Sequence, residues 1–278
     1  MKSFRWAPGM FLMVAVAGFS QVTVEVILDQ EVFLRDESLP VQVRITNRSG
    51  QTLKLGRETD WLSFAVENRD GNSVSRVGDP PVKEEFSLES SMVASRRVDL
   101  APYFNLSNPG RYLVTATIKI PEWTQEVASK PRNFDIVRGT KLWEQTVGVP
   151  GSGAAPEPRK YILHQAQLKR LTLYVRITDE GEFKTFRLMP VGTLVSFSRP
   201  EAQVDKTSNL HLLFQSGPRS FTYTAVTANG DVIVRQSHAY TASRPNLRAD
   251  EDGRIRVVGG ERLIAPDDIP PPAEALKR

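Results

Sequence analysis

Apolar and polar residues alternate strictly over several short stretches of the chain, and this limits the fold more than any other feature. Val22, Val24, Val26 and Leu28 fall on one side of a period-two pattern, and residues 41–45 repeat it. This period is that of a β-strand with one buried face, because successive side chains point to opposite faces. Helical periodicity is nearly absent, so the sequence predicts an all-β fold.

Turn signals separate these stretches at regular intervals. Residues 47–50 form a cluster of turn residues, and residues 68–71 end in an Asp-Gly pair, which favours a hairpin because Gly accepts a positive φ. The predicted strands are 22–28, 41–45, 62–66, 86–88, 96–100, 112–120 and 133–137. Seven short strands with turns about every 8–12 residues are typical of an immunoglobulin-like sandwich, which we assign to residues 21–138.

Two aromatic residues of this region have expected structural roles. Tyr112 follows Gly110 by two residues, which suits a corner tyrosine whose ring packs in the core and whose hydroxyl bonds a loop. Trp61 follows Asp60 at a strand start, where partial core burial is the preferred interpretation over a cap on one end of the sandwich.

Parts of the first domain resemble a known class of module. The segments that carry the resemblance are 40–47, 64–66 before Asp70-Gly71, 98–100 and 109–116. They are similar to secreted bacterial Ig-like modules, to intracellular proteinase-inhibitor-like domains and to the N-terminal β-domains of deuterolysin-type metalloproteases. The resemblance covers residues 39–120 and implies a sandwich fold, with proteinase inhibition as one function. The inhibitor-like families carry a Trp soon after the Asp-Gly turn, and residues 72–76 contain none.

The first residues have the pattern of a secretory signal peptide. Lys2 and Arg5 precede an apolar run at residues 10–17, and no acidic residue occurs before Glu25. A basic start, a short apolar run and small residues at its end predict a signal peptide over residues 1–20. We therefore expect export to the periplasm or the extracellular space. An uncleaved anchor is the alternative, and no other segment is long and apolar enough to span a bilayer.

Composition narrows the function classes. The chain has no cysteine, which excludes disulfides and thiolate metal sites. Loss of Lys2 and Arg5 with the leader would lower the net charge from +4 to +2. The remaining basic residues are interspersed with acidic ones and form no concentrated stripe, so we expect no nucleic-acid partner.

The alternation stops after Val137, and a different organisation follows. Residues 148–158 are rich in Gly, Pro and Ala, and we predict a flexible linker over residues 139–160. Residues 161–262 are predicted to form a second antiparallel β-domain. The last segment, 263–278, contains Pro270-Pro-Pro272 and is predicted to be a Pro-rich tail in polyproline II or disordered form.

The second domain contains an internal repeat. Residues 199–205 recur as residues 244–250, 45 positions later, each with Arg-Pro at its start and Asp at its end. The strand–turn–strand at 183–197 is matched to 221–234. A unit of this size corresponds to a β-propeller blade, and about two blade-like repeats are expected. Two units cannot close a propeller, so a small antiparallel sheet or sandwich is preferred over blades completed by another domain or chain.

No catalytic constellation is present in the sequence. The three histidines, His164, His211 and His238, are scattered without carboxylates at ligand spacing, so a three-His metal site is disfavoured. Residues 250–253 (Asp-Glu-Asp-Gly) resemble the front of a calcium loop, but the later acidic ligands are missing and a β-turn is preferred. We expect no catalytic residue, metal or cofactor.

The leading functional hypothesis is an exported, non-enzymatic binding or scaffold protein with a protein or polysaccharide partner of unknown identity. The alternatives are an extracellular proteinase inhibitor acting through the Ig-like domain and a glycan-binding module that uses exposed Trp or Tyr. The candidates for ligand contact are Trp61, Tyr103, Trp123, Arg219 and His238.

Overall fold

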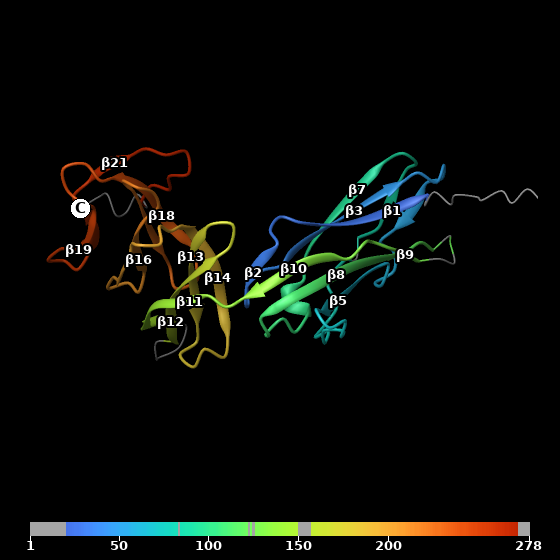
Figure 1. Ribbon diagram of the computed structural model, residues 1–278, viewed down its shortest axis with the longest axis horizontal. Helices are drawn as coiled ribbons and strands as arrows, with labels where there is room; N and C mark the ends of the chain where they lie inside the picture. Colours follow the sequence, from blue (N-terminus) through green and yellow to red (C-terminus); the bar gives the residue numbers. More distant parts are fainter. Residues whose placement is uncertain (1–20, 83, 122, 124–125, 150–156, 272–278) are drawn as a thin grey trace, which may run out of the picture.

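The protein is all-β. The computed structural model describes residues 21–82, 84–121, 123, 126–149 and 157–271, in which β-strands alternate with turns and one 3₁₀ turn, Ala101–Tyr103 (η1), is the sole helical element. Figure 1 shows two lobes, one built from β1–β10 and one from β11–β21. The predicted signal peptide, residues 1–20, lies outside the described residues. Within them, no helix is long and apolar enough to cross a membrane.

The N-terminal lobe is a two-sheet sandwich. One sheet has the order β1-β3-β7, and the other has the order β2-β10-β8-β5, with β9 also paired to β8. All pairs are antiparallel except β2 with β10, and β4 and β6 form a separate pair. The strands are β1 Val22–Leu28, β2 Val32–Leu34, β3 Pro40–Asn47, β4 Leu53–Leu55, β5 Leu62–Asn68, β6 Phe86–Leu88, β7 Val93–Asp99, β8 Gly110–Lys119, β9 Glu126–Ala128 and β10 Arg132–Val137.

The alternating residues of the sequence form the core of this sandwich. In β1 the four apolar positions are buried while Glu25 is exposed, as period-two strands require. Trp61 is fully buried and its indole Nε1 donates to the carbonyl of Val82 over 2.7 Å. Tyr112 stacks on Phe134, and its hydroxyl donates to a loop carbonyl, which confirms the predicted corner tyrosine.

The C-terminal lobe has three layers. The outer sheet β11-β12-β13-β14 packs on the middle sheet β15-β16-β17-β18-β21, and the hairpin β19-β20 covers the other face of the middle sheet. Because β16 lies in the middle layer, all of its residues are buried. The strands are β11 Thr140–Val149, β12 Glu157–Gln167, β13 Leu171–Thr178, β14 Thr185–Thr193, β15 Glu201–Val204, β16 Leu210–Gln215, β17 Ser220–Val226, β18 Val232–Ala239, β19 Asn246–Ala249, β20 Ile255–Val258 and β21 Glu261–Leu263.

The prediction of a linker over residues 139–160 was wrong for most of its length. Residues 140–149 form β11 and residues 157–160 begin β12, and the two strands pair as far as Val149 with Glu157. Trp143 and Val147 pack on the core between the outer and middle sheets, and this burial outweighs the local Gly and Pro content. The strands are therefore part of the second lobe, while residues 150–156 lie outside the described residues.

The internal repeat corresponds to two hairpins but not to two blades. β15–β16 and β19–β20 are both antiparallel hairpins whose turns follow Asp205 and Asp250 and contain a positive φ, at Ser208 and at Gly253. The match of residues 183–197 to residues 221–234 does not hold. Gly192 was expected in a turn, but it lies within β14, opposite Leu173 of β13.

Part of the predicted Pro-rich tail is ordered against the sheet. The backbones of Arg235 and Ile269 exchange two hydrogen bonds, and Arg262 pairs with Asp268 over 3.1 Å. The sequence prediction of a tail in polyproline II or disordered form was therefore wrong for this part, because its backbone pairs with that of β18. Residues 272–278 lie outside the described residues.

The two lobes meet at a small interface. Leu34 of the sandwich packs with Ala166 and Tyr174 of the second lobe. The hydroxyl of Tyr174 donates to the carboxylate of Glu37 over 3.4 Å, and Arg176 makes an ion pair with Asp36.

Candidate functional site

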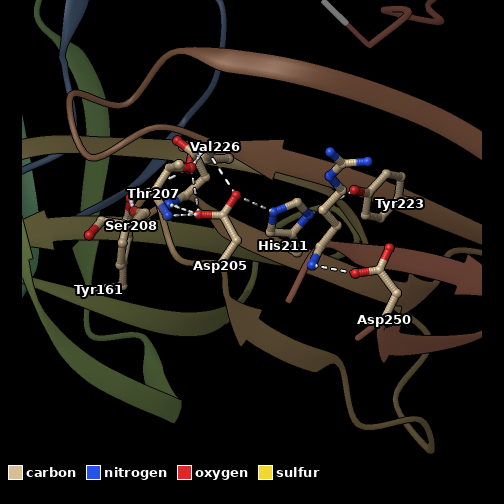
Figure 2. Close-up of polar contacts among 10 residues, drawn as sticks. Tyr161, Asp205, Thr207, Ser208, His211, Tyr223, Val226 and Asp250 are labelled. Atoms are coloured by element: carbon tan, nitrogen blue, oxygen red, sulfur yellow. Dashed lines mark hydrogen bonds and ion pairs between the residues drawn. The ribbon is translucent and has the colours of Figure 1, made fainter. Parts of the chain in front are cut away.

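A buried polar cluster lies at the centre of the second lobe (Figure 2). His211 on β16 contacts the carboxylate of Asp205 through Nε2 at 3.1 Å and the hydroxyl of Tyr223 through Nδ1 at 2.7 Å. Asp205 also accepts hydrogen bonds from the backbone of Thr207 and Asn209, each at 2.8 Å. The carboxylate therefore joins a hairpin turn to the face of the middle sheet.

The protonation of this cluster suits a structural role. Burial alone would raise the pKa of Asp205, but hydrogen bonds from His211, Asn209 and Thr207 outweigh it and hold that pKa below its usual value. Burial raises the pKa of Tyr223 to about 12, so its phenol stays neutral. Both ring nitrogens of His211 are occupied by protein groups. His211 and Tyr223 are both buried, so the cluster connects the hairpin turn after Asp205 to the middle sheet inside the fold.

The three histidines do not form a metal site. His211 is engaged as described, and His238 on β18 is buried, where burial and then Arg262 lower its pKa. His164 lies on β12 at the junction of the lobes. Across the described ranges, no three His, Asp or Glu side chains are grouped so that they could hold a metal ion.

The acidic segment 250–253 forms a turn between β19 and β20. Asp250 Oδ1 accepts the backbone N–H of Arg254 over 2.8 Å, and Asp250 pairs with Arg256 over 3.2 Å. The carboxylate that would be the first calcium ligand is thus used by its own hairpin, which is the geometry of an Asx-type turn.

The structure places the sequence-derived contact candidates mostly in structural positions. Trp61 is buried, and its indole N–H donates to the backbone carbonyl of Val82 inside the core. Tyr103 and Trp123 are half-buried against the sandwich core. Arg219 donates to the carbonyls of Tyr240 and Thr241. Together with buried His238, these residues do not share one site, and none of the three aromatic candidates forms an exposed platform.

A polar groove lies at one end of the N-terminal sandwich. It has a volume of about 720 Å³ and lies between the loop after β5, the loop before β8 and the end of β10. Its lining residues are Asn68, Arg69, Asp70, Ser73, Val74, Ser75, Asn105, Asn108, Pro109, Gly110, Arg111, Tyr112, Asp135, Ile136 and Val137. Amide, hydroxyl, guanidinium and carboxylate groups dominate this wall, so the groove is built for hydrogen bonding.

Several groups in the groove have unused hydrogen-bonding capacity. Arg69 is exposed, and its guanidinium has no partner among the residues that the structure describes. The amide nitrogens of Asn105 and Asn108 are likewise exposed and unpaired within the described chain, although the amide oxygen of Asn105 accepts from Ser107. These side chains can donate to a ligand without breaking a contact of the fold.

The rest of the wall is held in place. Asn68 Oδ1 accepts the backbone N–H groups of Asp70 and Asn72, at 3.0 and 2.9 Å, which fixes the first loop. Arg111 pairs with Asp135 across β8 and β10 over 3.1 Å. The groove therefore combines free donors with a fixed frame, as a pre-formed binding site requires.

Sequence reasoning did not find this groove. The sequence predicts a hairpin turn at residues 68–71, but its only signal for a site here is the content of Asn, Asp and Gly in residues 68–71 and 105–110. The two segments come together because β5 and β8 are neighbours, with Asn68 opposite Tyr112.

Comparisons with known proteins give distant structural similarities. No protein-family model and no curated protein matches the sequence. The sporulation control protein Spo0M of Bacillus subtilis is similar to 62% of this chain and 90% of its own, with 8% identity and a TM-score of 0.33. A family 123 glycoside hydrolase of Clostridium perfringens matches 43% of this chain and 28% of its own, with 9% identity and a TM-score of 0.28. The periplasmic chaperone SfaE matches 76% of this chain and 97% of its own, with 15% identity and a TM-score of 0.26. At such values these similarities assign no function.

Proposed function

We propose that the protein is a non-catalytic binding module whose groove at the end of the N-terminal sandwich binds a glycan. The observation that carries the proposal is the hydrogen-bonding wall of the groove, with unpaired donors on Arg69, Asn105 and Asn108. Its volume of about 720 Å³ falls within the roughly 300–1,000 Å³ of ligand pockets.

The chemistry of the wall suits a sugar. Hydroxyl groups both donate and accept, and the groove offers amide and guanidinium donors beside the carboxylate of Asp70. Val74 and Pro109, both half-buried, add small apolar surfaces against which the C–H faces of a sugar ring can pack. A ligand with alternating hydroxyl and C–H surfaces matches both kinds of group.

Two other ligand classes fit less well. An extended peptide that adds to a sheet needs a free strand edge, but Asp135 pairs with Arg111 on one side and with Val32 on the other. A nucleic acid needs an excess of positive charge, and the acidic groups Asp70 and Asp135 offset Arg69 and Arg111.

The expected export of the chain supports the same proposal. A secreted or periplasmic protein meets cell-envelope and extracellular polysaccharides. Catalysis is not part of the proposal: glycoside hydrolysis canonically uses two carboxyl groups, and of the two in the groove, Asp70 and Asp135, the second is paired with Arg111.

A glycan array followed by calorimetric titration tests this function. We expect binding to at least one glycan class, and we expect the double variant R69A/N108A to bind about tenfold or more weakly, since each lost hydrogen bond costs about 1 kcal/mol. The matched control is R48A, because Arg48 is exposed, lies outside the groove and has no side-chain partner within the described residues. Silence across the array, or equal affinities for the double variant and wild type, would contradict the proposal.

A further inference from the structure

A second cavity lies between the two lobes and has a different chemistry. Its volume is about 170 Å³, and its lining residues are Leu34, Arg35, Arg138, Gly139, His164, Arg176 and Leu188. Leu34 ends β2 of the sandwich, whereas His164, Arg176 and Leu188 lie on β12, β13 and β14 of the second lobe. The cavity is therefore assembled from both lobes.

The lining of this cavity is strongly cationic. It contains three guanidinium groups and no carboxylate. Asp36, the adjacent acid, pairs with Arg176 and lies 3.7 Å from the Nε of Arg35. Arg138 is exposed and makes no ion pair or hydrogen bond within the described ranges. One carboxylate thus contacts two of the three arginines, and Arg138 has no acidic partner among the described residues.

His164 adds an unsatisfied polar group to the same wall. Both of its ring nitrogens are buried and make no hydrogen bond of normal geometry with described residues. A buried polar atom without a partner is costly, so such atoms mark places where a ligand or a water binds. Burial, then the charges of Arg176 and Lys141, lower the pKa of His164, while the nearby backbone of Gly139 and then the charge of Glu182 act in the opposite direction. The ring therefore lies in a positive local potential.

The shape of the cavity depends on the residue that joins the lobes. A Cβ placed on Gly139 would lie 2.9 Å from Leu34 and 3.0 Å from the side chain of His164. The absence of a side chain at this position lets the connecting backbone pass close to the histidine and leaves the space beside it open.

From these observations we propose that the cavity is a binding site for a small oxyanion, such as phosphate, sulfate or a carboxylate, which links the two lobes. Arg35 and Arg138 come from the sandwich side, and Arg176 and His164 come from the second lobe. Guanidinium groups form paired, charge-assisted hydrogen bonds with oxyanions, and the imidazole of His164 supplies a further donor. Water could accept from the N–H of the imidazole but would not compensate the guanidinium charges, whereas an oxyanion accepts from that N–H and also compensates the charges.

Thermal unfolding of the full chain tests this site. The protein is unfolded in sodium phosphate, sulfate or acetate, each compared with sodium chloride at equal ionic strength. We expect at least one oxyanion to raise the Tm saturably, by about 2–5 °C at ten times its Kd. In R138A and in R35A the rise falls to less than half. Both side chains are exposed, so neither change is expected to prevent folding.

The control is R48A, which should respond to the anions as wild type does. Comparison of the three anions distinguishes the sources, because a carboxylate-selective response indicates an organic acid or a chain terminus, and a phosphate or sulfate response indicates an inorganic or ester ligand. An NMR titration of His164 gives a second readout, since a bound anion raises its pKa. A Tm that follows ionic strength alone, or an equal response in R138A and wild type, would overturn the proposal.

Discussion

The hydroxyl of Tyr112 donates a hydrogen bond to the backbone carbonyl of Asn108, 2.5 Å away. The ring of Tyr112 packs in the sandwich core against Phe134, while Asn108 belongs to the wall of the polar groove. One side chain thus connects the core of the fold with the loop that we propose to contact the ligand.

Tyr112→Phe removes this connection and keeps the ring. We expect a loss of about 0.5–1.5 kcal/mol in the free energy of unfolding, because one neutral hydrogen bond is lost and water can replace it at the exposed loop. Urea unfolding measures the change. A loss above about 3 kcal/mol would show that the ring has also moved, and a loss near zero would show that the hydroxyl contact is not made in solution.

Trp61→Ala should be among the most destabilising single changes in the sandwich. The side chain is fully buried, contacts Phe86 edge-on and donates to the carbonyl of Val82, so we expect a loss of about 3–5 kcal/mol. Trp123→Ala is the matched control, since Trp123 is only half-buried and should lose less. Equal losses in the two variants, measured by denaturant unfolding, would be inconsistent with the core as described.

Asp205→Ala should destabilise the protein more than Asp250→Ala. The two residues cap equivalent hairpin turns, but only Asp205 also contacts a buried histidine. The pKa of Asp205 is lowered in the folded state, so its contribution is present above its ordinary pKa of 3.8 and is lost as the pH falls through the lower folded value. Unfolding curves for wild type and both variants at pH 7 and pH 3 measure this. The gap between wild type and D205A should narrow in acid, and a constant gap would contradict the assignment.

Glu37→Gln tests the interface between the lobes. Here the pKa shift, and with it the expected change of stability with pH, has the opposite direction to that of Asp205. Burial raises the pKa of Glu37, and this effect is larger than the lowering by hydrogen bonds from Leu34, Gln30 and Tyr174. The folded state therefore binds the proton more tightly than the unfolded state. Wild type should therefore gain stability relative to E37Q as the pH falls from neutral toward 4.5. Thermal unfolding of both proteins between pH 4.5 and pH 8 provides the check. If wild type instead loses stability relative to E37Q as the pH falls, or if the difference between the two proteins does not change with pH, Glu37 is solvated.

The strands of the sandwich could be predicted because one side of each faces a single core. The alternation at Val22–Leu28 and the alternation that begins at Tyr112 in β8 both report burial on one face only, which a local pattern records. The hairpin of each repeat was also visible, since Asp and a following Gly or Ser specify a turn locally.

The misinterpreted segments depend on partners that lie far away in the sequence. β11 contains Gly148 beside Val147 and Val149, and only its pairing with β12 and its packing on the second core give it a strand structure. The groove and the junction cavity each combine residues from several elements, and no sequence spacing reports that assembly.

A ¹H–¹⁵N NMR titration with soluble oligosaccharides tests the binding function most directly. The side-chain amide signals of Asn105 and Asn108 report the groove from inside, and those of Asn209 and Asn246 in the second lobe serve as internal references. We expect at least one oligosaccharide to shift the Asn105 and Asn108 signals saturably while the reference signals stay in place. Unchanged signals throughout the titration series, or shifts confined to the second lobe, would contradict a glycan site in this groove.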